Sequence, residues 1–195
     1  MSVRIGVDID GCLANFNDSY IDRIIETTGR NLFPARPFDI PCWYYPEHYG
    51  YSKEETRRTW STITSDAKFW QYLPAYDWTM ECLNKLNSLS VNGSDVYFIT
   101  SRPGIKAKQQ TEYWLRSHGY YGIPTVLICS EKGQAASALD LSCYIDDRDV
   151  NVIDVTSKRG KKTSVFLLNR SWNRDFQHAA SLGIHRINSP LDMLD

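Results

Sequence analysis

The hydrophobic positions in the second half of the chain form short apolar runs separated by amphipathic segments of helical length. The segments 105–119 and 171–183 have the spacing of helices. The apolar runs predict strands at 95–100, 124–130, 141–147 and 162–169, with a last short strand at 184–187. Strands that alternate with helices predict a parallel sheet covered on both faces.

The first half of the chain has a different pattern. A buried strand is expected at 3–9, and helices are expected at 16–29, 52–65 and 77–89. Ser52, with Glu55 three residues later, is a capping pattern for the second of these helices. Four prolines in the stretch 31–50 predict a loop. We therefore predict an α/β protein with a three-layer, Rossmann-like parallel core (residues 1–14 and 76–195) and a small, mostly helical cap (15–75) inserted after the first strand.

Composition and charge narrow the class of protein. The chain has 195 residues, 42% of them hydrophobic, and a net charge of −1, whereas proteins that bind long nucleic acids are usually basic. The chain has five cysteines, an odd number, and no two of them form a CxxC pair. Both observations disfavour a disulfide framework or a zinc cluster. No signal pattern or membrane-spanning apolar stretch is seen. These features predict a cytoplasmic protein with reduced thiols. Its expected partner is a small molecule, and neither a membrane nor a nucleic-acid duplex is expected. The sequence does not decide whether the protein forms a homodimer.

The candidate chemistry lies at the ends of the expected strands. Asp8 and Asp10 alternate with apolar residues, so their side chains point the same way and repel each other unless a positive group lies between them. Ligands of parallel α/β sheets bind at the carboxyl ends of the strands. The other expected strands supply polar groups at that edge: Thr100, Ser101 and Arg102, then Ser130 and Lys132, then Asp146 and Asp147.

This set of groups predicts a site for a metal ion and a phosphate. Clustered carboxylates with oxygen ligands favour Mg²⁺ over zinc. A carboxylate that attacks phosphorus needs the negative charge of the phosphate neutralised, which Mg²⁺ and Lys132 would do. Asp10 could then protonate the leaving oxygen and later deprotonate a water. Gly11 would allow the tight turn that places Asp10 over the site.

The motifs resemble those of a known family. DxDG at a first strand, a Thr at a second, a Lys, and IDD at a fourth resemble the haloacid dehalogenase superfamily of phosphatases. Within it, VDIDGCLANF, FITSRPG, YIDDRDVN and FLLNRSWNR are similar to the 5′(3′)-deoxyribonucleotidase (C-type 5′-nucleotidase) family. The resemblance implies a phosphatase acting on (deoxy)nucleoside monophosphates through an aspartyl-phosphate.

The resemblance also implies roles for single residues. Asp8 would be the nucleophile and Asp10 the acid and base, while Thr100 and Lys132 would bind the phosphate. Mg²⁺ would be held by Asp8, the backbone carbonyl of Asp10, and either Asp146 or Asp147. Ser101 and Arg102 complete the candidate substrate ligands.

Several candidates have simpler interpretations. A loop lysine such as Lys132 is most often solvated, and Lys106 or Lys108 could replace it. We expect Asp149 to cap a helix and Arg148 to form a local ion pair. None of the four histidines falls in a motif, which disfavours a histidine phosphatase or a zinc site.

Aromatic residues are concentrated in the cap: residues 16–78 hold 15 of the 25 in the chain. Most should pack a small core, but a few could stack on a base. Stacking is worth about 1–3 kcal/mol per base. The candidates for stacking are Phe16, Phe38, Trp43, Tyr44 and Tyr45.

Two other functions fit part of the pattern. A 3′-phosphatase acting on nucleic-acid ends would need a more basic rim, which Arg57, Arg58 and Arg102 support only modestly. A non-enzymatic module that binds metal and phosphate, such as a receiver domain, would carry its acid pair on the first strand and its phosphorylated Asp on a middle strand. Here Asp146 and Asp147 come last instead, which argues against that module.

Overall fold

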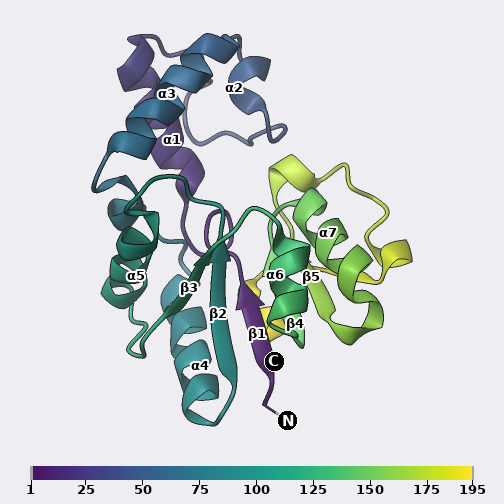
Figure 1. The fold of residues 1–195 in the computed structure, drawn as a ribbon. Helices are drawn as coiled ribbons and strands as arrows, with labels where there is room; N and C mark the ends of the chain where they lie inside the picture. Colours follow the sequence, from purple (N-terminus) through teal and green to yellow (C-terminus); the bar gives the residue numbers. More distant parts are fainter. Residues whose placement is uncertain (1, 195) are drawn as a thin grey trace.

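The computed structural model describes residues 2–194. Its centre is one parallel sheet with the strand order β3-β2-β1-β4-β5-β6 (Figure 1). The first strand is therefore central, with β2 on one side and β4 on the other. The strands are β1 (Arg4–Val7), β2 (Asp95–Thr100), β3 (Thr125–Ile128), β4 (Cys143–Asp146), β5 (Ser164–Leu168) and β6 (Ile184–Ile187).

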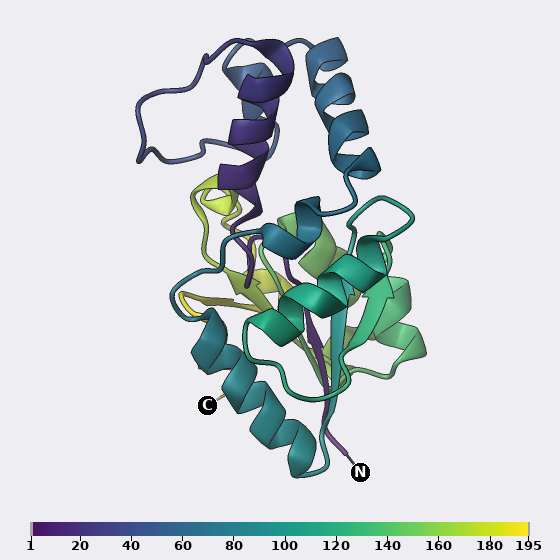
Figure 2. The same ribbon diagram turned by 90° about the vertical axis from the view of Figure 1, so that its left-hand side faces the viewer.

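Helices cover both faces of the sheet, as the strand and helix pattern predicted (Figures 1 and 2). One face carries α4 (Thr79–Val91) and α5 (Ala107–Ser117), and the other carries α6 (Lys132–Ala138) and α7 (Asp149–Arg159). Neighbouring residues of β2 point to opposite faces, so Phe98 joins the core cluster below α4 and α5, and Ile99 joins the cluster below α6 and α7. Burial on both faces explains why β1, β4 and β5 are mostly apolar.

A cap stands over the carboxyl ends of the strands (Figures 1 and 2). It contains α1 (Phe16–Thr28), α2 (Tyr45–His48) and α3 (Lys53–Ser65). The predicted capping box at the start of α3 is confirmed, because Glu55 N donates to Ser52 Oγ and Ser52 N donates to the Glu55 carboxylate. The expected loop 31–50 is irregular except for the single helical turn of α2.

The connection from the cap back to the core runs through a short 3₁₀ helix, η1 (Phe69–Tyr72). It lies against α5, where Trp70 N donates to Gln110 Oε1 at 2.9 Å. The chain enters and leaves the cap side by side, since Ala14 and Ala75 form a β-bridge. The division into a core and a 15–75 cap stays a prediction.

The predicted helix over 171–183 is wrong. The segment forms two short 3₁₀ turns, η3 (Ser171–Asn173) and η4 (Ala180–Leu182). Elsewhere, η2 (Gly160–Lys162) precedes β5 and η5 (Pro190–Met193) follows β6. Arg186 on β6 donates to the carbonyl of Phe176 at 2.9 Å and to Asn173 Oδ1 at 2.8 Å. The Phe176 carbonyl and the Asn173 side chain are therefore oriented by Arg186 and not by the hydrogen-bond repeat of a helix. No helix among residues 2–194 is both long and apolar enough to cross a membrane.

Candidate active site

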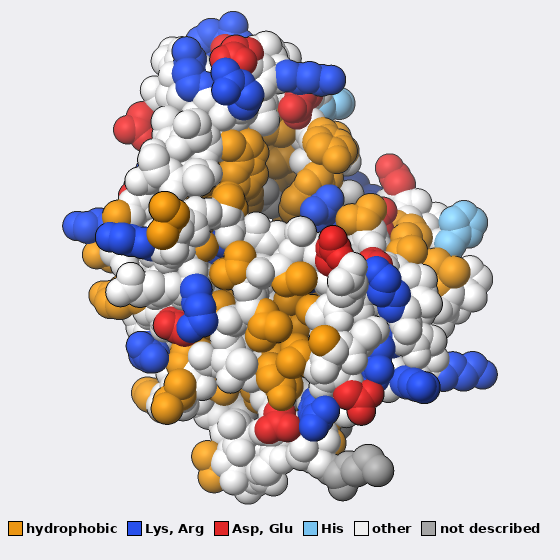
Figure 3. Space-filling model, in the orientation of Figure 1, with side chains coloured by type: hydrophobic (Ala, Val, Ile, Leu, Met, Phe, Trp, Pro, Cys, Tyr) orange, Lys and Arg blue, Asp and Glu red, His pale blue; other side chains and the backbone are white. Residues whose placement is uncertain are grey.

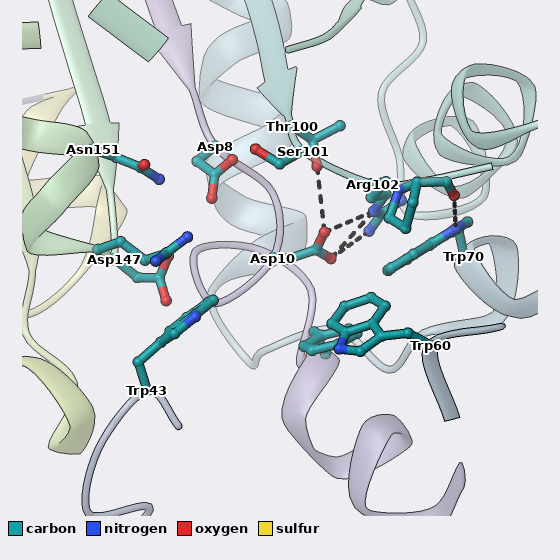
Figure 4. A pocket seen from close by; sticks show the side chains of 13 residues that line it. Asp8, Asp10, Trp43, Trp60, Trp70, Thr100, Ser101, Arg102, Asp147 and Asn151 are labelled. Carbon is teal, nitrogen blue, oxygen red and sulfur yellow. Dashed lines mark hydrogen bonds and ion pairs between the residues drawn. The ribbon is translucent and has the colours of Figure 1, made fainter. Parts of the chain in front are cut away.

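A cavity of about 90 Å³ lies between the cap and the carboxyl edge of the sheet. Figure 3 shows hydrophobic side chains gathered in a hollow below the upper part of the molecule, and Figure 4 shows the cavity residues from close by. Aromatic cap residues and polar strand-end residues share its lining: Asp8, Asp10, Phe16, Trp43, Trp60, Trp70, Thr100, Ser101, Arg102, Pro103, Asp147, Arg148 and Asn151.

Asp8 follows β1 and is nearly buried, with its backbone N–H donating to Ile145 O of β4 at 3.0 Å. Lys132 at the start of α6 reaches across and donates to Asp8 Oδ1 at 2.7 Å. Burial raises the pKa of Asp8 to about 7, although the charge of Lys132 opposes the shift. Burial lowers the pKa of Lys132, but the charges of Asp8 and Asp146 outweigh this and raise it above its ordinary value. The structure thus brings Lys132 to Asp8, whereas Lys108 pairs with Glu112 on α5.

Asp10 lies on the other side of the cavity and meets Arg102 (Figure 4). Arg102 Nε donates to Asp10 Oδ2 at 2.9 Å, and Arg102 Nη2 donates to Asp10 Oδ1 at 2.8 Å. Thr100, at the end of β2, adds a contact from Oγ1 to Asp10 Oδ2 at 3.3 Å. We expected Arg102 to contact substrate from its place in the sequence, but in the structure its guanidinium contacts Asp10.

Asp146 and Asp147 have different surroundings, although both are buried. The carboxylate of Asp146 accepts hydrogen bonds from Asn151 Nδ2, Arg148 N and Tyr144 OH. Asp147 Oδ2 accepts one hydrogen bond, from Trp172 Nε1 at 2.9 Å. Within residues 2–194, no donor reaches Asp147 Oδ1, although that atom is buried. Asp147 therefore keeps an oxygen available for a ligand, and Asp146 does not.

The electrostatics of Asp147 agree with a cation site. Burial raises its pKa well above the ordinary range, and the nearby charges of Asp146 and Asp8 add to the shift. Ligand atoms of Asp8, Cys12 and Asp147 all lie within 4.8 Å of one another. Burial, with Asp147 and Asp8 nearby, also raises the pKa of Cys12, so this group stays a neutral thiol.

The turn after Asp10 depends on Gly11, as the sequence predicted. Its φ of +83° lies in the left-handed region, and a Cβ there would come within 2.1 Å of Asp147 Oδ2. Arg170, which follows β5, donates from Nε to Gly11 O at 2.7 Å and holds the turn in place. The guanidinium of Arg170 is itself stacked 4.1 Å from the centroid of the Tyr76 ring.

The remaining polar candidates are at or beside the cavity. Ser101 lines it and donates from Oγ to Cys129 O at 3.2 Å. Asp149 is in the first turn of α7, where an acid suits the helix dipole. Arg148, for which we expected an ion pair, lies 4.0 Å from the centroid of the Trp43 ring and so connects α7 to the cap.

The aromatic candidates separate into three groups. Phe16 and Trp43 line the cavity at the strand ends and also a second cavity of about 160 Å³ within the cap. Tyr44 and Tyr45 line the second cavity only, whereas Phe38 stacks on Phe33 in the cap core. The second cavity also contains polar groups, among them Glu47 and Asn17.

Sequence reasoning missed several residues of the site. Trp60 and Trp70 face the cavity from α3 and η1, and Asn151 contacts Asp146 from one turn into α7. The tryptophans have no motif of their own, and their helical spacing resembles that of core residues. Trp172 and Arg170 lie in the FLLNRSWNR stretch, so the resemblance pointed to the segment without indicating their contacts.

The sequence as a whole matches a known family. Residues 1–188 match the family model described as 5′ nucleotidase, deoxy (pyrimidine), cytosolic type C protein. The chain belongs to this family. The expected resemblance to the 5′-nucleotidase family is thereby confirmed, and the protein is a phosphoric monoester hydrolase of nucleotidase type. This membership disfavours the non-enzymatic module.

Individual relatives agree with the family and the fold. A protein of Oceanobacillus iheyensis described as a putative nucleotidase is 24% identical over 181 residues, which cover 89% of this chain and 90% of that protein. A haloacid dehalogenase-like hydrolase of Streptococcus pneumoniae has a TM-score of 0.63 at 14% identity, covering 99% of this chain and 97% of that one. A protein of Clostridium acetobutylicum described as a predicted phosphatase has a TM-score of 0.62 at 15% identity, covering 100% and 97%. These structures share the fold.

Proposed function

We propose that this protein is a Mg²⁺-dependent phosphatase that removes phosphate from (deoxy)nucleoside monophosphates through an aspartyl-phosphate on Asp8. One observation supports the proposal most: Asp8 and Asp10 both line a single cavity but have different partners. Asp8 is buried against Lys132, and Asp10 is held by Arg102 and Thr100. Two carboxylates in different environments are suited to two different roles in one reaction.

The donor set fits a magnesium ion. Asp8 and Asp147 would supply carboxylate oxygens and Asp10 its backbone carbonyl, the hard oxygen ligands that Mg²⁺ prefers. The unpaired oxygen of Asp147 favours it over Asp146 as the direct ligand, and Asp146 would fix the loop through Asn151 and the Arg148 backbone. When bound, the cation would supply positive charge beside the phosphate and the Asp8 carboxylate.

The residues of the chain would then have the following roles in the two steps of the reaction. A carboxylate oxygen of Asp8 attacks phosphorus, the bond from phosphorus to the ester oxygen breaks, and Asp10 gives its proton to that oxygen. In the second step Asp10 takes a proton from a water whose oxygen attacks phosphorus, and the bond to Asp8 breaks. Lys132, with Thr100 and Ser101, would bind the phosphate oxygens during both steps.

The cap supports a nucleoside as the rest of the substrate. The two cavities share Phe16, Trp43 and Trp60 in their linings, so a flat group could lie beside the phosphate site. The hydroxyl of Tyr45 is buried in the second cavity and has no hydrogen-bond partner among residues 2–194. A base would supply both a face for the aromatic rings and a polar edge for such a group.

The proposal is tested by turnover of a panel of phosphate esters by the purified protein. We expect 5′- and 3′-phosphorylated mononucleotides to have a higher kcat/KM than p-nitrophenyl phosphate, which has no nucleoside part. EDTA should abolish turnover and added Mg²⁺ should restore it, because the charge of the phosphate must be neutralised before a carboxylate attacks it. Full activity in EDTA would exclude the mechanism. A preference for 3′-phosphorylated oligonucleotides over every mononucleotide would favour the nucleic-acid-end phosphatase instead.

Replacing Trp43 by alanine tests the role of the cap. We expect Trp43→Ala to lower kcat/KM for nucleotides about 10-fold, within the range of a lost stacking contact, and to change turnover of p-nitrophenyl phosphate less. The matched control is Tyr72→Ala, an exposed cap aromatic outside both cavities. Equal losses on both esters would mean that Trp43 only holds the cap against Arg148.

A further inference from the structure

We propose that Arg102 is a positioning residue for Asp10 and does not bind the substrate phosphate. This inference rests on the proposed function, because it assigns Arg102 a part in the acid step of that reaction. It also differs from the role that the position of Arg102 after β2 predicted.

The contact between the two side chains is a two-point contact. Arg102 Nε and Nη2 donate to different oxygens of Asp10, at 2.9 and 2.8 Å. The guanidinium is planar, so a pair of parallel hydrogen bonds fixes the rotation of the carboxylate as well as its position. Asp10 still lines the cavity, and its side chain is 21% exposed while that of Arg102 is 0% exposed.

The guanidinium of Arg102 is itself held in place by residues other than Asp10. Its Nη1 donates to Thr111 Oγ1 of α5 at 2.9 Å. The ring centroids of Trp70 and Trp114 lie 5.2 and 5.9 Å from the guanidinium carbon. The two indoles are fixed in turn by hydrogen bonds to backbone carbonyls, Trp70 to Pro103 and Trp114 to Leu73. A buried guanidinium is costly unless it is paired, and Asp10 is its carboxylate partner here.

The arrangement places Arg102 behind Asp10 as seen from the reacting centre. Figure 4 shows Asp10 between Asp8 and Arg102. Each of the three guanidinium nitrogens already donates to a protein group. Arg102 would therefore affect the reaction through the orientation of Asp10, whereas Lys132 contacts Asp8 directly.

The chemical consequence depends on the leaving group. While a bond forms between Asp8 and phosphorus, the bond to the leaving oxygen breaks and that oxygen takes the proton of Asp10. The alkoxide of a nucleoside is a strong base and needs this proton, whereas p-nitrophenolate is a stable anion and does not. An error in the position of Asp10 should therefore slow nucleotides and not the nitrophenyl ester.

The experiment compares kcat/KM for a deoxynucleoside 5′-monophosphate and for p-nitrophenyl phosphate, since kcat/KM reports the first chemical step in both cases. For Arg102→Gln we expect a loss of about 100-fold on the nucleotide and less than about 3-fold on the nitrophenyl ester. Arg102→Lys keeps the charge without the two-point contact and should show the same selectivity with a smaller loss. Thr111→Val removes only the support behind Arg102 and extends the series if Arg102→Gln does not fold.

A double variant provides a second measurement. If Arg102 acts through Asp10, Arg102→Gln in the Asp10→Asn background should cause little further loss on the nucleotide, because the group that it positions has already been changed. Equal losses on both esters, or additive losses in the double variant, would overturn the proposal and make Arg102 a phosphate ligand or a purely structural residue. A wild-type protein inactive on both esters would contradict the proposed function itself, which is a distinguishable result.

Discussion

Replacing Asp8 by asparagine is expected to lower kcat by about 10⁴-fold or more, comparable with the loss of a nucleophile in other covalent enzymes. Asparagine has nearly the same shape as aspartate and keeps an oxygen for Lys132 Nζ, but its neutral amide does not attack phosphorus. The measurement is steady-state turnover of a nucleoside monophosphate, with circular dichroism to show that the variant is folded. A matched control is Asp22→Asn, an exposed cap carboxylate paired with Arg36, which should leave kcat unchanged.

Binding of a phosphate analogue gives an independent check on Asp8. Beryllofluoride with Mg²⁺ should raise the melting temperature of the wild type and not that of Asp8→Asn, because the analogue must bond to a carboxylate oxygen. Near-normal turnover by Asp8→Asn would show that another group is the nucleophile.

The second large effect is expected at Asp147. Asp147→Asn should weaken Mg²⁺ binding by at least about 100-fold, because even outer-shell partners of a metal site cost up to that much. Asp146→Asn should instead lower stability by about 1–3 kcal/mol, since an amide nitrogen would face donors that now bond to a carboxylate. Calorimetric titration with Mg²⁺ and thermal denaturation separate the two effects.

The opposite result would reverse the assignment. If Asp146→Asn lost Mg²⁺ affinity and Asp147→Asn kept it, the unpaired oxygen of Asp147 would have another purpose. The hydrogen bond from Trp172 to Asp147 would then be the first place to look for it.

The shared burial of Asp8 and Asp147 is a physical reason to expect that the site depends on a cation. Both are buried carboxylates whose pKa values are raised chiefly by burial. The charge of Asp146 raises both pKa values further, and the charge of Asp8 also raises that of Asp147. A cation between them would offset the cost of burying each negative charge. Because raised pKa values favour the protonated carboxyls, the cation would have to displace protons to bind.

Much of the fold was determined by local patterns in the sequence. The apolar runs predicted the parallel sheet, because strands buried on both faces carry a continuous signal that needs no knowledge of their neighbours. The Ser52–Glu55 cap and the Gly11 turn were also predictable, since each depends on residues within a few positions. The helix predicted between 171 and 183 was wrong. Arg186 of β6 donates to the carbonyl of Phe176 in that segment, a contact that the local pattern does not reveal.

For the site, the sequence alone determined that the polar residues at the strand ends meet at the carboxyl edge of the sheet, since parallel strands bring their ends together whatever lies between them. It did not determine which pairs form there. Lys132 on Asp8, Arg102 on Asp10 and Trp172 on Asp147 join residues 124, 92 and 25 positions apart. Those contacts depend on side-chain direction, depth of burial and the packing of the cap, which are properties of the tertiary structure. Only the folded chain could therefore show that Asp147 has an oxygen without a partner, unlike Asp146, and that Arg102 contacts Asp10.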